Sequence, residues 1–241
     1  MRSTRVSILI SALLVAGLAH PARAQAARTD AVPKIEPQRF AAEIAEFDKE
    51  GPAPKDAIVV TGASSIKRWH PTIKEDLAPL TLIPRGFGGS TMEDLVYWLD
   101  RLVLAYKPRA VVIYEGDNDT GRYNVPPAKI AEQFGDIVKK IHAALPKTRI
   151  YVIGIKPSVL RWAVWPVSVE ANNIMKAMAE KDPLVTYIDV ATPMLQPDGK
   201  VMTDIFVEDN LHLNPKGYKI WTAAVRAVLI PAEAQHEGGG R

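Results

Sequence analysis

Two segments far apart in the sequence carry the residue types that cleave or transfer an acyl ester. Ser64 lies in a Gly-Ala-Ser-Ser segment and can act as a nucleophile, while His212 can take the proton from its hydroxyl. Asp209 precedes His212 by three residues, a spacing at which a carboxylate in a tight turn can reach one imidazole nitrogen and leave the other for the serine. A serine nucleophile needs such a base and such an orienting group. These three residues are therefore the candidate catalytic group.

Two further segments contain donors for the negative charge that develops on a tetrahedral oxygen. A glycine-dense loop over residues 85–91 precedes a predicted helix, so its backbone N–H groups can approach an anion. Asn118 follows an apolar run at 110–114 and can donate from its side-chain amide. Taken singly, each of the four segments also fits an ordinary turn or helix cap without chemistry. The glycine loop lacks the Lys-Ser/Thr pair of a phosphate-binding loop.

Alternating strand and helix patterns predict how these segments come together. Apolar runs rich in β-branched residues predict strands at 57–61, 110–114, 149–155 and 184–190, with a weaker candidate at 80–83. Helical periodicity begins near Phe40 and recurs at 92–104, 126–145, 168–180 and 215–229. Strands this uniformly apolar are buried on both faces, as in parallel sheets. We therefore predict an α/β fold, a doubly wound three-layer sandwich around a central, mostly parallel five-stranded sheet, with ligands bound beyond the carboxyl ends of the strands.

The four segments, in this order, resemble the sequence blocks of the SGNH hydrolase superfamily, also called the GDSL family of esterases and lipases. The resemblance covers nearly the whole chain after its first residues and implies a flavodoxin-like fold. The chain resembles in particular the branch near the platelet-activating factor acetylhydrolases, where the serine block often has extra serines, as Ala63-Ser64-Ser65 does here. It implies that Ser64 is the nucleophile, His212 the base and Asp209 its orienting group. It also implies an oxyanion hole formed by the backbone N–H groups of Ser64 and Gly89 and by the side chain of Asn118.

Two features distinguish this chain from the usual family pattern. Ala63 stands where the GDSL motif has its aspartate, and Ser65 offers a second hydroxyl beside Ser64. The aspartate position does not itself react, so the first change leaves the chemistry intact. An α/β-hydrolase has the same order of serine, acid and histidine, but its serine elbow reads Gly-x-Ser-x-Gly, and Ile66 occupies the second glycine position here. That fold is the second interpretation.

The two ends of the chain are predicted to lie outside the catalytic domain. Arg2 and Arg5 precede an apolar run over residues 6–18 that is followed by Ala-Arg-Ala at 22–24, the pattern of a secretory signal peptide. We predict a signal peptide at 1–24, cleavage after Ala24, and export to the periplasm or the medium. Residues 25–36 are predicted to form a leader, residues 37–231 the hydrolase domain, and residues 232–241 a disordered tail.

Composition excludes several other classes of protein. The chain has no cysteine, so disulfides, a thiolate nucleophile and cysteine-ligated metals are excluded. The formal charge of +3 falls to zero when the signal peptide, with three arginines and no acid, is removed, which disfavours a nucleic-acid partner. The first apolar run is too short to favour stable membrane insertion. Histidines at ligand spacing are absent, so we expect neither a metal nor another cofactor, and we expect His70 and His142 to be structural.

The sequence thus predicts an exported serine esterase that hydrolyses short-chain, acetyl-like esters of small molecules or carbohydrates through an acyl-enzyme. A polysaccharide O-acetyltransferase with the same catalytic group is one alternative, and a non-catalytic carbohydrate-binding module on the same fold is another. Arg85, Trp162 and Trp165 are predicted to contact the substrate. Glu115 and Asp117 are expected at the mouth of the site, where their charges would favour a polar leaving group. The oligomeric state stays open.

Overall fold

The structure is a computed structural model that describes residues 32–238. The predicted signal peptide at 1–24 and residues 25–31 of the predicted leader lie outside the described residues, so both stay predictions. None of the helices within residues 32–238 is long and apolar enough to cross a membrane.

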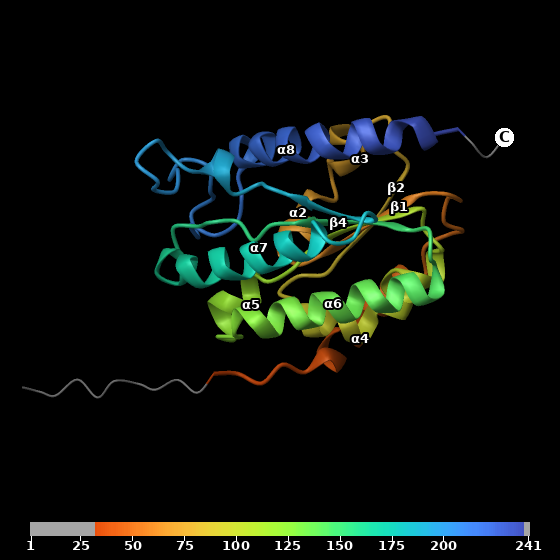
Figure 1. Cartoon of the computed structure of the whole chain (residues 1–241), viewed down its shortest axis with the longest axis horizontal. Coiled ribbons are helices and arrows are strands. Elements are labelled where there is room, and N and C mark those ends of the chain that lie inside the picture. Colours follow the sequence, from red (N-terminus) through yellow and green to blue (C-terminus); the bar gives the residue numbers. More distant parts are fainter. Residues whose placement is uncertain (1–31, 239–241) are drawn as a thin grey trace, which may run out of the picture. The chain divides into compact units, whose positions relative to one another are not determined.

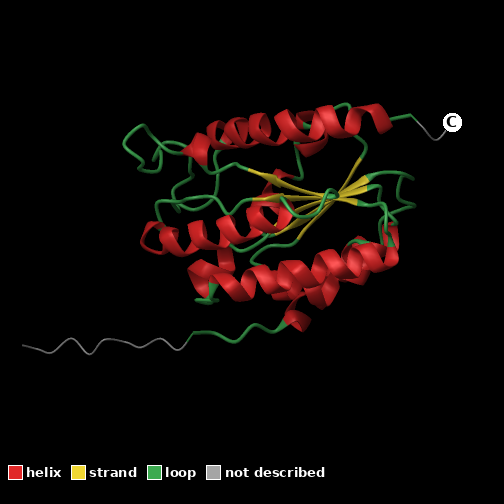
Figure 2. Ribbon diagram, viewed as in Figure 1, coloured by secondary structure: helices red, strands yellow, loops and turns green. Residues whose placement is uncertain are grey.

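Within the described residues, five strands form one sheet in the order β2-β1-β3-β4-β5, and all four strand pairs are parallel (Figure 2). The strands are β1 (Ile58–Gly62), β2 (Leu82–Gly86), β3 (Ala110–Tyr114), β4 (Arg149–Ile153) and β5 (Val185–Ile188). The helices are η1 (Pro37–Phe40), α1 (Ala41–Phe47), α2 (Ser64–Trp69), α3 (Ile73–Asp76), α4 (Met92–Leu102), η2 (Leu104–Tyr106), α5 (Asp117–Arg122), α6 (Pro127–Ala144), η3 (Trp162–Val164), α7 (Trp165–Ala179), η4 (Thr192–Met194), α8 (Pro215–Glu233) and η5 (Ala234–His236). The predicted five-stranded α/β fold is confirmed.

Side chains of each strand alternate between two apolar cores, one on each face of the sheet. Val59 and Val111 pack with residues of α4, α6 and α7 on one face. Val60 and Val112 pack with residues of α2, α3 and α8 on the other face (Figure 1). Because both faces are covered by helices, the strands are apolar at nearly every position, which is why the sequence predicts a parallel sheet. The predicted three-layer, doubly wound arrangement is confirmed.

The strand order reverses next to β1, at the position where folds of this kind bind their ligands. The chain leaves β1 to form β2 on one side and then crosses to β3 on the other, and such a reversal opens a binding crevice at the carboxyl ends of the strands. Gly62 ends β1 with a φ of +138°, and a Cβ there would lie 2.1 Å from the carbonyl oxygen of Tyr114. Only glycine fits so close to β3. The chain can therefore turn directly into α2, whose first residue is Ser64.

The last helix begins at a cap that also orders the loop before it. The side chain of Asn214 accepts a hydrogen bond of 3.0 Å from the N–H of Gly217, and Pro215 is the first helical residue, as the sequence predicts. The side-chain amide of Asn214 donates to the carbonyl oxygens of Asp204 and Phe206 at 2.9 and 3.0 Å. The segment that contains His212 is thus anchored to the start of α8.

The predicted start of the disordered tail, residue 232, is corrected by the structure. Helix α8 continues to Glu233, whose side chain is fully buried. Its carboxylate accepts hydrogen bonds from Arg149 at 2.5 and 2.9 Å, from Arg109 at 3.0 Å and from the Tyr151 hydroxyl at 2.7 Å. The two arginines lie at the amino ends of β3 and β4. The sequence pattern misses this anchor because the partners are far from Glu233 in the chain.

We expect Glu233→Gln to lower the free energy of unfolding at neutral pH by about 3–5 kcal/mol, because two guanidinium groups lose their shared buried carboxylate. Burial alone would raise the pKa of Glu233, but its hydrogen bonds with Arg149, Tyr151 and Arg109 lower it. Its stabilising contribution is therefore complete above the ordinary glutamate pKa and disappears as the pH falls through the lowered value. Urea unfolding at neutral and acidic pH measures this. Glu170→Gln, on the exposed side of α7, is the control and should change stability by less than about 0.5 kcal/mol; equal losses in both variants contradict the prediction.

Candidate active site

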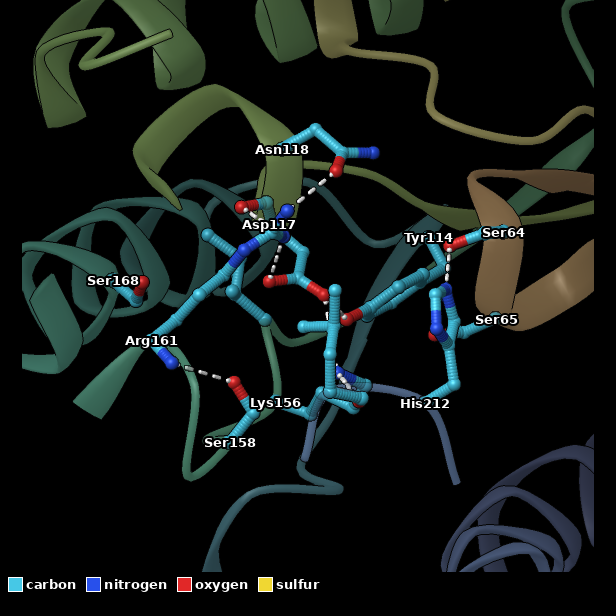
Figure 3. Close-up of polar contacts among 12 residues, drawn as sticks. Ser64, Ser65, Tyr114, Asp117, Asn118, Lys156, Ser158, Arg161, Ser168 and His212 are labelled. Carbon is cyan, nitrogen blue, oxygen red and sulfur yellow. Dashed lines mark hydrogen bonds and ion pairs between the residues drawn. The ribbon is translucent and has the colours of Figure 1, made fainter. Parts of the chain in front are cut away.

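Ser64 and His212 meet at the crevice beyond β1 and β3 (Figure 3). The Oγ atom of Ser64 lies 2.8 Å from Nε2 of His212, and Nδ1 of His212 lies 2.6 Å from Oδ2 of Asp209. The three candidate catalytic residues thus form one continuous hydrogen-bonded chain. This is the arrangement in which a carboxylate orients an imidazole and the imidazole accepts a proton from a serine hydroxyl.

The acid–base turn, residues 209–212, has a backbone that holds its own carboxylate. Asn210 adopts a φ of +57°, a left-handed conformation that asparagine tolerates better than most residues. The chain reverses there, and Oδ1 of Asp209 accepts hydrogen bonds of 2.9 Å from the N–H groups of both Leu211 and His212. The spacing of three residues between acid and base therefore produces one compact unit in which both groups are fixed relative to each other.

The same contacts set the charge of Asp209. Burial alone would raise its pKa, but hydrogen bonds from the imidazole and N–H of His212 and from the N–H of Leu211 hold the pKa well below its usual range. The carboxylate is therefore ionised at neutral pH and accepts the Nδ1 proton of His212. That tautomer leaves Nε2 with a free lone pair facing Ser64, as a general base requires.

The residues expected to form an oxyanion hole lie in the segments that follow β1, β2 and β3. The N–H of Ser64 lies in the first turn of α2, where helical N–H groups have no intrahelical acceptor. Gly89 has a φ of +86°, a conformation that favours glycine, and nothing lies within 4 Å of the place where a Cβ would stand. Asn118 is buried and donates from Nδ2 to the carbonyl oxygen of Ser90 at 2.8 Å. Its amide nitrogen is turned to the Ser64 side of the site in Figure 3.

The buried carboxyl group of Glu115 contacts the glycine loop. Glu115 is fully buried, and its Oε1 shares a hydrogen bond of 2.6 Å with the hydroxyl of Ser90. Burial, with the nearby charge of Asp119, raises the pKa of Glu115 well above its ordinary value. The expectation that Glu115 places a charge at the mouth is therefore wrong, because its side chain turns into the protein and meets Ser90.

The predicted substrate contact of Arg85 is also wrong. Its side chain is buried on β2, where Nε donates to the Tyr106 hydroxyl at 2.8 Å and Nη1 lies 2.9 Å from Glu50. Alternate residues of a strand face opposite sides of the sheet, and Arg85 shares the side of Ile83. It therefore points toward α1 and η2 and away from the crevice.

Asp117 lies close to the crevice but offers it no free charge. Burial alone would raise its pKa, but the positive charges of Lys156 and Arg161 lower the pKa to about 2. Nζ of Lys156 lies 3.1 Å and Nη1 of Arg161 lies 2.6 Å from the carboxylate. Lys156 has no predicted role, although it directly follows the apolar run predicted at 149–155 and lies at the same end of the sheet. That position was the one signal in the sequence that could have identified it.

The other aromatic and histidine expectations have different outcomes. The rings of Trp162 and Trp165 stack with centroids 6.3 Å apart, and Trp162 is exposed; their contact with substrate stays a prediction. His70 accepts a hydrogen bond of 2.9 Å from the N–H of Gly86, and its pKa is lowered to about 4 by burial and by the charge of Arg85. It is a neutral structural residue, as expected.

Several solved structures have a similar fold. A protein from Streptococcus pneumonia, described as a proposed platelet activating factor, has a TM-score of 0.70 and 18% identity over 80% of this chain and 92% of its own. A GDSL-like lipase from Bacteroides thetaiotaomicron has a TM-score of 0.66 and 19% identity over 82% and 98%. A catalytic mutant of an acetylxylan esterase from Geobacillus stearothermophilus has a TM-score of 0.58 and 14% identity over 73% and 95%. At these identities the likeness shows the fold alone.

The family comparison goes further than the fold. No curated protein matches this chain. Residues 50–220, well over half of the sequence, match the GDSL-like lipase/acylhydrolase family, and they include every residue of the hydrogen-bonded chain at the crevice. The match decides against the alternative of a non-catalytic binding module. The chain belongs to the GDSL-like lipase/acylhydrolase family of the SGNH superfamily and is a serine-dependent hydrolase of carboxylic esters.

Proposed function

We propose that this protein is exported and hydrolyses short-chain, acetyl-like esters through an acyl-enzyme on Ser64. The observation that carries the proposal is the continuous chain of contacts, 2.8 Å from Ser64 to His212 and 2.6 Å from His212 to Asp209. Such distances allow direct proton transfer from the hydroxyl to the imidazole.

The first half of the reaction forms the acyl-enzyme. Oγ of Ser64 attacks the ester carbonyl carbon while Nε2 of His212 takes the hydroxyl proton, and Asp209 stabilises the resulting imidazolium. The carbonyl oxygen becomes an oxyanion that accepts hydrogen bonds from the N–H groups of Ser64 and Gly89 and from Nδ2 of Asn118. As the tetrahedral intermediate collapses, the bond to the leaving oxygen breaks, and the imidazolium donates its proton to that oxygen.

The second half releases the acid. A water molecule gives a proton to Nε2 of His212 and attacks the acyl carbon, so the same oxyanion donors are used again. The ester bond to Ser64 then breaks, its oxygen recovers the proton, and the carboxylic acid leaves.

The substrate class is proposed from the surroundings of the catalytic group. The side chain of Asp209 is 41% exposed and that of His212 is 16% exposed, so the leaving-group side of the site is open enough for a bulky alcohol. Trp162, which is exposed, stacks on the half-buried Trp165 in the segment after β4, and the pair offers flat apolar area of the kind that packs against sugar rings. The similar fold of an acetylxylan esterase supports a carbohydrate ester with a short acyl group.

Replacing the nucleophile should abolish turnover. We expect Ser64→Ala to lower kcat for p-nitrophenyl acetate by about 10⁴-fold or more, because the acyl-enzyme cannot form. Ser65→Ala is the matched control, since Ser65 is buried beside the nucleophile and its hydroxyl is not the one facing His212. A fluorophosphonate should label the wild type and Ser65→Ala but not Ser64→Ala. Full activity of Ser64→Ala would refute the assignment.

Removing the side-chain donor of the oxyanion hole should slow the chemistry and leave substrate binding nearly intact. We expect Asn118→Ala to reduce kcat by about 10²- to 10³-fold, the usual cost of losing one such donor, with a small change in KM. Steady-state kinetics on p-nitrophenyl acetate measure both constants. A change confined to KM would show that Asn118 contacts the substrate in its ground state instead.

A series of p-nitrophenyl esters from acetyl to longer acyl chains tests the proposed acyl preference. We expect kcat/KM to be highest for acetyl and to fall as the chain lengthens, and we expect acetate release from acetylated xylan. Trp162→Ala with Trp165→Ala should raise KM for the polysaccharide and leave p-nitrophenyl acetate almost unaffected, because a small ester does not reach a sugar platform. Highest activity on long acyl chains would contradict the proposal.

A further inference from the structure

A buried cluster of charges lies to one side of the Ser64–His212 pair and next to Asn118 (Figure 3). At its centre is Asp117, whose Oδ1 accepts a hydrogen bond of 2.6 Å from Nη1 of Arg161. Its Oδ2 accepts one of 3.1 Å from Nζ of Lys156 and one of 3.2 Å from the hydroxyl of Tyr114. Lys156, Asp117 and Arg161 together form a bridging cluster, because each cation also contacts a different part of the site.

Arg161 contacts Asn118, the side-chain donor expected in the oxyanion hole. Its Nη2 donates to Oδ1 of Asn118 at 2.9 Å, and its Nη1 also donates to the backbone oxygen of Asp117 at 2.7 Å. A guanidinium has donors only, so this contact fixes which end of the Asn118 amide is oxygen. One proton of Nδ2 is used by the carbonyl oxygen of Ser90, and the second remains for the substrate. The cation also polarises the amide, which strengthens Nδ2 as a donor.

Lys156 contacts the acid–base turn. Its Nζ donates to the carbonyl oxygen of Leu211, inside the turn, at 2.9 Å, and its side chain is fully buried. The N–H of Leu160, from the same segment, donates to the carbonyl oxygen of Asn210 at 3.0 Å. The segment after β4 therefore holds two consecutive carbonyl groups of the turn, directly before His212.

The fold makes room for Arg161 at a glycine. A Cβ on Gly121 of α5 would lie 2.3 Å from Cδ and 2.4 Å from Nε of Arg161. The guanidinium can reach Asn118 only because position 121 has no side chain. The side chain of Arg161 is 14% exposed and that of Asp117 is 9% exposed, so this ion pair is largely removed from water. Apolar residues stabilise a core as well as such pairs do, which favours a role in positioning over one in stability alone.

We propose that Arg161 and Lys156 are positioning residues of the ester hydrolysis, joined through Asp117, and that they set the oxyanion donor and the acid–base turn at a fixed separation. Arg161 acts through Asn118, and Lys156 acts through the backbone of the turn. The inference rests on the proposed function, because it assigns both residues to the same reaction.

A double-mutant cycle tests whether Arg161 acts through Asn118, which is the Arg161 arm of the bridging cluster. We expect Arg161→Gln to lower kcat for p-nitrophenyl acetate by about 10- to 100-fold with little change in KM, the scale of a catalytic donor displaced by about 1 Å. In the Asn118→Ala background the same substitution should change kcat by less than about twofold, because the group through which it acts is gone. Multiplicative losses would overturn this arm. If Arg161→Gln does not fold, Arg161→Lys, which keeps the charge but lacks the fork, replaces it in the same cycle.

Gly121→Ala moves the guanidinium without removing its charge. We expect it to reproduce the fall in kcat of Arg161→Gln, and we expect the two substitutions combined to cost little more than either one. Gly135→Ala, in the middle of α6, is the matched control: its Cβ would meet only the terminal methyl of Met178, at 3.2 Å. Wild-type kcat in Gly121→Ala would overturn the role of the guanidinium.

A second double-mutant cycle tests whether Lys156 acts through the acid–base turn, which is the Lys156 arm of the bridging cluster. We expect Lys156→Met, similar in length and apolar, to lower kcat by about 10-fold or more and to slow fluorophosphonate labelling of Ser64, because the imidazole is no longer held against the hydroxyl. In the Asp209→Asn background the loss should shrink to less than about twofold. Unchanged labelling in Lys156→Met would overturn this arm. If Lys156→Met does not fold, Lys156→Arg is used in the same cycle and should also slow the labelling.

The activity of the wild type distinguishes failure of the proposed function from failure of the proposed positioning role. If it hydrolyses no p-nitrophenyl ester, or if Ser64→Ala stays active, the proposed function itself fails. If the wild type is active and Ser64→Ala is inactive but the cycles are multiplicative, only the positioning role of the bridging cluster fails.

Discussion

The hydrogen bond between Ser64 and His212 joins residues 148 positions apart, and much of the fold serves to bring them together. On the serine side, β1 is an interior strand between β2 and β3, and Gly62 lets the chain pass close to β3 before α2 begins. On the histidine side, the cap of α8 and the amine of Lys156 hold the irregular segment that follows β5. A contact this short between the start of α2 and the acid–base turn is possible because both are fixed to regular structure.

The strands were predictable from the sequence because both faces of the sheet are buried. Edge positions were less predictable. The weak strand expected at 80–83 is found as β2 at Leu82–Gly86, since Pro84 and Arg85 interrupt the apolar pattern. An edge strand tolerates a proline there because one side of it has no partner. Similarly, α7 begins at Trp165 and not at 168, because Pro166 in its first turn fits a helix start that the periodicity alone does not reveal.

The catalytic residues were predictable for a different reason. Serine, histidine and aspartate in these blocks follow a known order, and the structure brings Ser64, His212 and Asp209 together. The charges near the mouth were not predictable, because burial and partner identity are properties of the assembled fold. Arg85 faces the wrong side of the sheet, and Arg161 finds its partner only once α5 leaves a gap beside it.

Buried ion pairs lie at both ends of the strands. The bridging cluster lies at the carboxyl ends of the strands, whereas the carboxylate of Glu233 ties together the amino ends of β3 and β4. Because these two groups share no residue, substitutions in them are expected to affect different properties, the free energy of unfolding in one case and the turnover rate in the other. A substitution at the amino ends of the strands reduces the fraction of molecules that are folded, while each folded molecule keeps its full turnover rate. If the bridging cluster has the positioning role proposed above, substitutions in it lower the turnover of each folded molecule, so thermal stability and catalytic rate are set by different residues of this protein.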